Sequence, residues 1–311
     1  MFIDSHIHLS HKLYNQNFPY VDMSESGFCV SDEGSRELVI SRMKDAGIGC
    51  VIEPAIDLAS NELLLELCSR YSDYIYAAVG VHPTRTPQTP WKMRHRLDEY
   101  VKKERVVAVG ELGLDYHYAR LEQHRMKQKR WIKYQLKLAD RMGLPLVLHI
   151  READRDAIRI LKRHKNKIHG GVCHCFGGPP DIARIYTEEL GLCLGIGGTL
   201  LMKPEISENL EKTVKEIPLE YLMLETDGPY VKPQKPDGIT GKKWTKARNT
   251  SLIIPAIAQR VAELKEIPVE EVERVTTENV KRVFGCVSVD EMHRDIMTSG
   301  NKKYLDRACG F

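Results

Sequence analysis

The stretch Phe2-Ile3-Asp4-Ser5-His6-Ile7-His8 indicates the fold, because it is a short apolar strand that ends in two histidines. Seven further runs have a similar form, are rich in Val, Ile and Leu, and mostly lack apolar–polar alternation. Such runs are typical of strands that are buried on both faces of a parallel sheet. The candidate strands are Phe2–Ile7, Gly49–Glu53, Ile75–Val81, Val106–Glu111, Leu146–His149, Gly171–His174, Leu192–Ile196 and Tyr221–Glu225.

Polar segments with helical periodicity lie between these strands. The clearest of them covers about Arg120–Met142, and Gly143 ends it. Asn249–Leu264 and Pro268–Phe284 are predicted to be closing helices. Eight strand–helix units predict an α/β fold of the (β/α)₈ barrel type, which typically needs ~250 residues. A doubly wound open sheet is the alternative that periodicity leaves open.

The composition is that of a globular protein. The 311 residues are 42% hydrophobic and 29% charged, which argues against a disordered or fibrous chain. No apolar run approaches the roughly 20 residues that cross a bilayer, and the start lacks the features of a signal peptide. We therefore expect a cytoplasmic protein with no membrane partner, in which the eight scattered cysteines are reduced thiols. The net charge of +3 permits a polyanionic partner without requiring one.

Two segments depart from the regular strand–helix alternation. Ser10–Gly34 is a polar segment, longer than the usual connection of about 2–6 residues, and we expect a loop that forms a rim or lid of the barrel. The end of the chain has weak patterning. We therefore predict a single barrel domain over residues 1–285 and a peripheral tail over residues 286–311.

Groups that can bind a metal recur where the candidate strands end. In a parallel barrel these ends meet at one mouth. His6 and His8 are two residues apart, so their rings point to the same side of the strand. Each such residue taken alone is more often a hydrogen-bonded or capping side chain, but their shared position predicts a metal site. The six candidate ligands are His6, His8, Glu111, His149, His174 and Asp227.

Four imidazoles and two carboxylates suit a divalent transition metal better than Ca²⁺. Six ligands exceed what one tetrahedral zinc ion needs. A pair of metals about 3.5–4 Å apart, bridged by a carboxylate, would use all six and leave positions open for water and substrate. We therefore expect two divalent metal ions, drawn from Zn²⁺, Mn²⁺, Mg²⁺, Ni²⁺ or Co²⁺.

Four other residues are candidates for substrate binding. His82 and Arg151 could each contact a phosphate, although a turn histidine and a surface charge explain them equally well. Lys243 and Trp244 follow the last candidate strand and could bind a nucleic-acid backbone and stack on a base. The basic clusters within Lys127–Arg130 and Arg159–Lys167 are interpreted as solvated outer faces of helices.

The order of these motifs resembles that of the TatD family of metal-dependent deoxyribonucleases, in the wider amidohydrolase-like group. The resemblance covers about Met1–Gly285 and implies a TIM barrel. Gly228 and Ile150 stand where serines are common in that family. The matching stretches are Phe2–His8, Gly80–Pro83, Val109–Tyr116, Leu146–Ala153, His174–Gly177, Gly195–Gly198, Leu224–Tyr230, Arg248–Asn249 and Thr276–Val280.

The resemblance implies that the family's ligand pattern applies at the matching positions, where Glu111 would bridge two metals. The first metal has His6, His8, Glu111 and Asp227 as ligands, and the second has Glu111, His149 and His174. Asp227 then accepts a proton from the attacking water, so that Asp227 and Glu111 are the catalytic candidates.

The sequence therefore predicts a hydrolase that cleaves DNA phosphodiester bonds, acting as an exonuclease on single-stranded or frayed ends. Two alternatives remain open at this point. One is a hydrolase of a small amide, ester or lactone, since barrels change substrate through their loops. The other is a non-catalytic subunit that binds nucleic acid or a protein. DNA is the expected partner, and the sequence indicates no protein partner.

Overall fold

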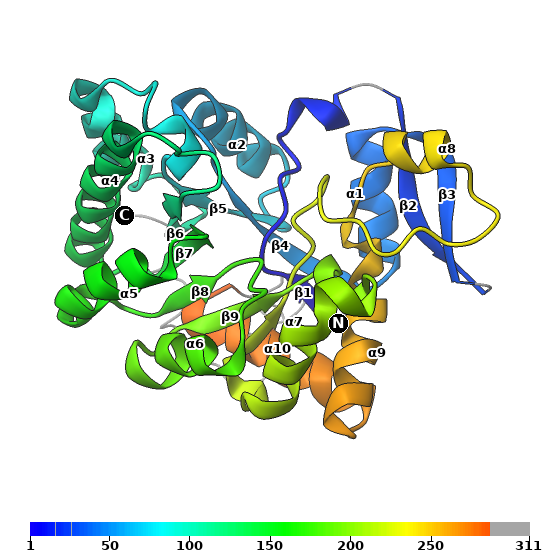
Figure 1. Ribbon diagram of the computed structural model, residues 1–311. Coiled ribbons are helices and arrows are strands. Elements are labelled where there is room, and N and C mark those ends of the chain that lie inside the picture. The colour runs from blue at the N-terminus through cyan, green and yellow to red at the C-terminus, as the bar shows by residue number, and fades with distance from the viewer. Residues whose placement is uncertain (16, 26, 287–311) are drawn as a thin grey trace, which may run out of the picture.

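A computed structural model describes residues 1–15, 17–25 and 27–286 (Figure 1). At its centre is an eight-stranded parallel sheet in which each strand pairs with the next one along the chain. These strands are β1 (Phe2–Asp4), β4 (Ile48–Pro54), β5 (Ile75–Val79), β6 (Val106–Asp115), β7 (Leu146–Arg151), β8 (Gly171–Cys173), β9 (Cys193–Ile196) and β10 (Leu222–Leu224).

Main-chain hydrogen bonds join the first and last of these strands. The Ser5 amide donates to the Leu224 carbonyl (3.0 Å), and the Asp227 amide donates to the His6 carbonyl (2.8 Å). Ile7 and Gly228 then form an isolated parallel bridge. The sheet therefore closes into a barrel, which confirms the (β/α)₈ prediction and excludes the open doubly wound sheet.

Helices surround the barrel (Figure 1). The two predicted closing helices correspond closely to the last two, and Gly143 ends α4 in the left-handed conformation (φ 64°). The α-helices are α1 (Arg36–Asp45), α2 (Leu58–Arg70), α3 (His95–Tyr100), α4 (Glu122–Met142), α5 (Asp154–Arg163), α6 (Pro180–Arg184), α7 (Pro204–Glu216), α8 (Gly241–Lys246), α9 (Ile254–Lys265) and α10 (Val269–Phe284).

Single turns of other helix types complete the connections. The 3₁₀ turns are η1 (Lys12–Tyr14), η2 (Pro83–Arg85), η3 (Trp91–Arg94), η4 (Lys165–Lys167), η6 (Gly198–Leu201), η7 (Leu219–Tyr221) and η8 (Ser251–Ile253), and η5 (Ile185–Glu189) is a π-helical turn. Among the described residues, no helix is both long and apolar enough to span a bilayer.

The interior of the barrel is filled with side chains. Strand residues such as Ile52 and Val147 share one buried cluster with Val280 and Phe284 of α10. α10 also contacts both β1 and β10. A filled interior is typical of this fold and leaves the carboxyl ends of the strands as the place for a site.

The prediction of a loop over Ser10–Gly34 is wrong. This segment contains an antiparallel hairpin of β2 (Phe18–Ser24) and β3 (Gly27–Gly34), which lies beside α8 (Figure 1). The Val21 amide donates to the Arg248 carbonyl (2.8 Å), so the hairpin is joined to the chain that follows β10. Its position agrees with the rim element that we expected. Of the tail predicted for 286–311, only Cys286 lies within the described residues.

Two buried carboxylates hold the loops at the ends of the strands. Asp4 accepts hydrogen bonds from the hydroxyls of Thr226 (2.6 Å) and Ser251 (2.7 Å), which ties β1 to the loop after β10. Glu53 accepts a hydrogen bond from the Ser10 amide (2.6 Å). Burial raises the pKa of each carboxyl to about 7.

Gly113 is a position where any side chain would separate β6 from β7. A Cβ atom there would lie 1.9 Å from the His149 carbonyl oxygen. We expect Gly113→Ala to lower the free energy of unfolding by roughly 2 kcal/mol, because the backbone of a paired strand has to move. Gly143→Ala is the control, since that position also has a positive φ but is surrounded by open space, and should cost about 1 kcal/mol. Equal midpoints in urea for the two variants would contradict the steric argument.

Glu53 predicts a pH dependence of stability in the metal-free protein. Its pKa is raised from 4.5 to about 7 in the folded state, so the folded protein is more stable when the Glu53 carboxyl is protonated. Stability should therefore fall as the pH rises from about 4.5 to about 7. Glu53→Gln keeps an acceptor for Ser10 but has no charge, so it should be more stable than the parent at pH 8, by up to roughly 3 kcal/mol. Urea unfolding of the variant and the parent at pH 5 and pH 8 tests this. A difference in the free energy of unfolding that is equal at the two pH values would contradict it.

Candidate metal centre

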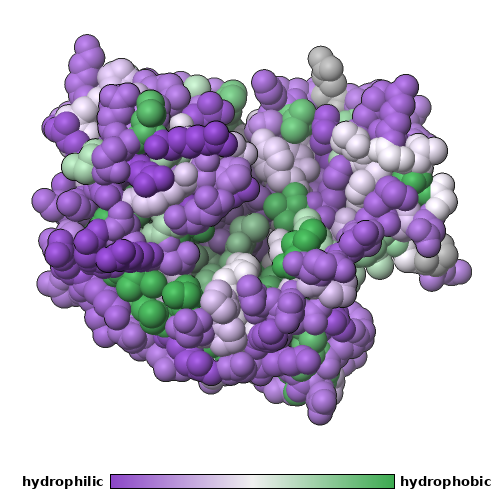
Figure 2. Space-filling view, in the orientation of Figure 1, coloured by the Kyte–Doolittle hydropathy of each residue, from purple (hydrophilic) through white to green (hydrophobic). Residues whose placement is uncertain are grey.

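Six side chains from five strand ends meet at the mouth of the barrel. The loops after β1 and β10 border a hollow in the surface, between the wall that carries α4 and the side that carries α8 and the hairpin (Figures 1 and 2). Four of the six residues are buried, and the side chains of His149 and Asp227 are each 16% exposed. The structure brings together the complete set that the strand ends suggested, namely His6, His8, Glu111, His149, His174 and Asp227.

The first group of ligand atoms comes from β1, β6 and the loop after β10. The Nε2 atoms of His6 and His8 are 3.2 Å apart. Asp227 Oδ1 lies 3.7 Å from the former and 3.4 Å from the latter. Glu111 Oε2 lies 3.6 Å and 3.7 Å from the same two nitrogens. Two imidazole nitrogens and two carboxylate oxygens therefore surround one point.

The second group comes from β6, β7 and β8. His149 Nδ1 and His174 Nε2 are 3.0 Å apart. Each lies 2.8 Å from Glu111 Oε1. One oxygen of Glu111 thus faces the first group and the other oxygen faces the second group. This is the arrangement of a carboxylate that can bridge two cations.

Local irregularities of the backbone present two of these carboxylates. The pairing of β6 with β7 shifts register between Val109 and Leu112, so Glu111 lies at a bulge. Bulges are frequent beside active sites because they redirect a side chain. Asp227 has a positive φ of 51°, a conformation that aspartate tolerates better than most residues.

Other groups orient the histidine rings from behind. His149 Nε2 lies 3.0 Å from Asp115 Oδ2, and the Asp115 carboxylate also accepts a hydrogen bond from the Tyr118 amide. His8 Nδ1 lies 3.1 Å from the Pro54 carbonyl oxygen, to which it can donate a proton. Such partners fix the ring orientation and the tautomer of metal-binding histidines.

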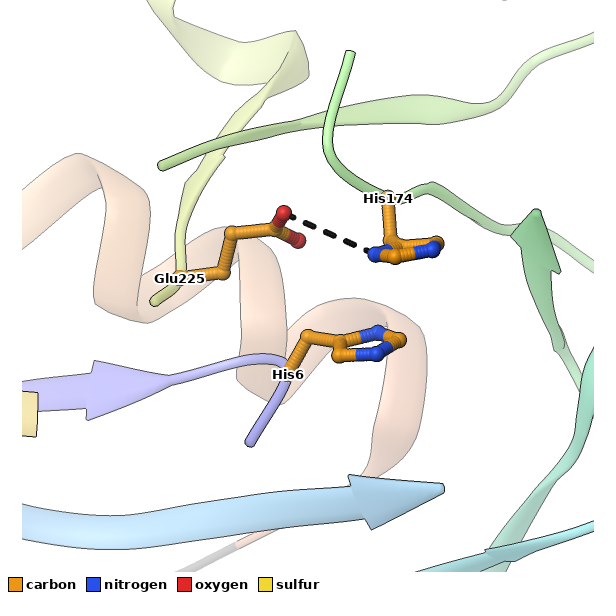
Figure 3. Close-up of side chains that lie close together, drawn as sticks. All are labelled: His6, His174 and Glu225. Carbon is orange, nitrogen blue, oxygen red and sulfur yellow. Dashed lines mark ion pairs between the residues drawn. The ribbon is translucent and has the colours of Figure 1, made fainter. Parts of the chain in front are cut away.

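Glu225 is a buried member of the site that sequence reasoning did not assign. Its Oε1 lies 3.8 Å from His174 Nδ1, and the ring of His174 stacks on that of His6 with centroids 3.8 Å apart (Figure 3). His6 Nδ1, His174 Nδ1 and Glu225 Oε2 are buried without a hydrogen-bond partner. The signal was available, because Glu225 is the last residue of a candidate strand, as Glu111, His149 and His174 are.

The donor set and its electrostatics fit a bound cation. Burial and the neighbouring His174 hold the pKa of His6 well below its usual value, so its ring is neutral and has a free lone pair. Burial raises the pKa of Glu111, but His82 and His174 outweigh this and keep the pKa well below its usual value. A charged carboxylate among buried imidazoles is the environment that a divalent metal stabilises.

The four predicted substrate contacts have different surroundings. His82 Nε2 lies 3.2 Å from Glu111 Oε1, so this residue is part of the cluster itself. Arg151 is exposed at the end of β7, with its guanidinium 5.4 Å from the ring of Tyr118. Lys243 forms an ion pair with Asp32 of the hairpin (2.8 Å). Trp244 is half-buried and packs against the main hydrophobic core.

Comparisons with known proteins agree with this geometry. The family model for TatD related DNase matches residues 3–285. YabD of Bacillus subtilis strain 168, named an uncharacterized metal-dependent hydrolase, is 32% identical over 91% of this chain and 99% of its own. The 3'-5' ssDNA/RNA exonuclease TatD of Pantoea ananatis is 30% identical over 81% of this chain and 94% of its own.

A solved structure has the same fold over almost the full length. The TatD homolog YJJV from Escherichia coli K12 superimposes with a TM-score of 0.75 at 28% sequence identity, and the match covers 92% of this chain and 98% of that one. The resemblance inferred from the motifs is thereby confirmed. With its barrel, its cluster of strand-end ligands and a family match over nearly the whole length, the chain belongs to the TatD related DNase family.

Proposed function

We propose that the chain is a metal-dependent exonuclease that hydrolyses phosphodiester bonds at single-stranded or frayed DNA ends. The observation that carries the proposal is the position of Glu111, whose two oxygens face two separate groups of ligand atoms. The name of the Pantoea relative, a 3'-5' ssDNA/RNA exonuclease, supports the substrate class. The described cysteines are all free thiols, which supports the expected cytoplasmic location.

The ligand atoms divide naturally between two divalent ions, drawn from Zn²⁺, Mn²⁺, Mg²⁺, Ni²⁺ or Co²⁺. His6, His8 and Asp227 would hold the first, His149 and His174 would hold the second, and Glu111 would contact both. Divalent ions at such a centre lower the pKa of water toward neutrality and offset the negative charge of phosphate oxygens.

Asp227 is the proposed proton acceptor. Its carboxylate is part of the first ligand group and is partly open to solvent, so it can reach a water molecule beside that group. Removing a proton from this water strengthens its attack on phosphorus, and the bond to the leaving oxygen then breaks. The charged form of Glu111 has a different task, which is to hold the two groups of ligands at a fixed separation.

The four predicted substrate contacts remain part of the proposal, but their surroundings suit them unequally for binding a substrate. Arg151 is exposed at the end of β7, beside His149, and its planar guanidinium suits a phosphate. His82 touches Glu111 and can position that carboxylate as well as contact substrate. Lys243 would have to exchange its ion pair with Asp32 before it could bind a phosphate, and Trp244 would stack on a base with the part of its ring face that is exposed.

Hydrolysis of end-labelled single-stranded DNA tests the function directly. With added Mg²⁺ or Mn²⁺ we expect release of mononucleotides, and Asp227→Asn should lower the rate about 10²–10⁴-fold while the fold is retained, because the proton acceptor is lost. Asp237→Asn is the control, since this exposed carboxylate lies in the same loop region. Normal activity of the Asp227 variant would remove that residue from the chemistry. Hydrolysis of small esters or lactones, with no action on DNA, would contradict the nuclease proposal.

Metal counting tests the bridge. Glu111→Gln replaces one of the two carboxylate oxygens by an amide nitrogen that does not bind a cation well. We expect fewer than two metal ions per chain by elemental analysis of the variant, against two for the parent protein. Glu152→Gln, an exposed change next to β7, should leave the count unchanged. Unchanged occupancy in the Glu111 variant would show that this residue does not bridge.

A further inference from the structure

A groove of about 580 Å³ lies on the outer wall of the barrel, along α4 and the turn η3. Five cations line it, and none of the described residues that line it is acidic. Trp91 and Tyr134 supply aromatic surface, and Met126 lies among them. The cations are Lys127, Lys129, Arg130, Lys133 and Lys137. A concave surface with this charge is suited to an anion that is larger than a single ion.

Most of these cations lack a carboxylate partner within the part of the chain that the structure describes. Lys129 is the exception, since its Nζ lies 2.8 Å from Asp156. Lys127 donates to the Pro87 carbonyl, and the Arg130 guanidinium lies 3.9 Å over the ring of Trp91. Lys133 and Lys137 are exposed. The groove therefore has several charges that are available to a ligand.

The spacing of the charges along α4 is regular. Arg130, Lys133 and Lys137 are three and four residues apart, so they share one face of the helix. The opposite face, with Ile132 and Leu136, is buried against the barrel. At a rise of ~1.5 Å per residue, Arg130 and Lys137 are roughly 10 Å apart along the helix axis. A row of charges of this kind matches a repeating anion better than a compact one.

Hydrogen bonds from α4 fix the position of this helix along the barrel axis, relative to the metal centre. The side chain of Gln128 bonds to both the amide and the carbonyl of Asp115 (3.0 Å each), the residue whose carboxylate contacts His149. The first turns of α4 thus lie level with the mouth of the barrel. The surface on the α4 side of the molecule is mostly hydrophilic (Figures 1 and 2).

We propose that this α4 groove binds the sugar–phosphate backbone of a single-stranded nucleic acid, at nucleotides outside the metal centre. The inference rests on the proposed nuclease function and adds a second point of attachment for long substrates. The phosphates are the repeating anions that the row of cations matches, and the helix that carries this row begins level with the mouth of the barrel. The sequence analysis interpreted the basic cluster within Lys127–Arg130 as a solvated helix face. The proposal gives this cluster a role in binding.

Binding in the absence of turnover tests the proposal. Lys133→Glu/Lys137→Glu in the metal-free protein should weaken the affinity for a long labelled single-stranded oligonucleotide by about 10-fold or more in fluorescence anisotropy. The slope of log affinity against log salt should fall by about 1.4, since each phosphate contact contributes about 0.7 for single strands. Lys212→Glu/Lys215→Glu on α7 makes the same charge change on two exposed residues and should have a smaller effect. Equal losses for the two double variants would overturn the proposal.

Catalysis with the metal-loaded protein separates this inference from the proposed function. The Lys133/Lys137 variant should hydrolyse a dinucleotide at the parental rate but show a raised KM for the long oligonucleotide with unchanged kcat. If the parent hydrolyses neither substrate, the nuclease function fails, whatever the anisotropy gives. If the parent is active and the Lys133/Lys137 variant hydrolyses the long substrate with the parental KM, the groove proposal fails while the nuclease function stands. Tighter binding of polyglutamate than of an oligonucleotide of equal charge would also overturn it in favour of an acidic protein partner.

Discussion

The carboxylate of Glu111 is the group on which the arrangement of the site depends. It is buried among imidazoles, and its two oxygens lie 2.8–3.7 Å from nitrogens that four other strand ends or loops supply, including His82 after β5. A buried carboxylate is costly unless neighbouring groups favour its charge. The histidines provide part of that compensation, and a bound cation would provide more. Because one side chain contacts both groups of ligands, a small displacement of β6 would change both at once.

The barrel around this carboxylate limits such displacement. Asp4 joins β1 to the loop that carries Asp227, and Gln128 of α4 holds the main chain of Asp115 behind His149. The packed interior leaves no space for the strands to move inward. The ligands therefore lie on strands or within four residues after a strand, where buried hydrogen bonds hold the backbone. Preorganised groups of this kind need little rearrangement when they bind a cation or a transition state.

The sequence allowed most of the fold and the six candidate ligands to be predicted, because buried strands and the residues at their ends are local patterns. The hairpin within Ser10–Gly34 could not be predicted in this way, since its apolar residues Phe18, Tyr20 and Val21 are buried through contacts with a segment more than 200 residues away. The same distance hid the ion pair between Lys243 and Asp32. Glu225 was missed for a different reason: it was interpreted as part of a strand, although it is the last residue of that strand, as Glu111 and His149 are of theirs.

The way in which the barrel closes has a consequence for how the chain can fold. Ser5 bonds to Leu224, which lies 219 positions further along, so β1 has only one of its two neighbours until β10 has been synthesised. The apolar interior also receives Val280 and Phe284 from the last helix. Contacts between such distant segments form slowly, because long loops must close first. During synthesis His6 and His8 therefore remain without Asp227 until most of the domain has left the ribosome, and the cation site is among the last features to be completed.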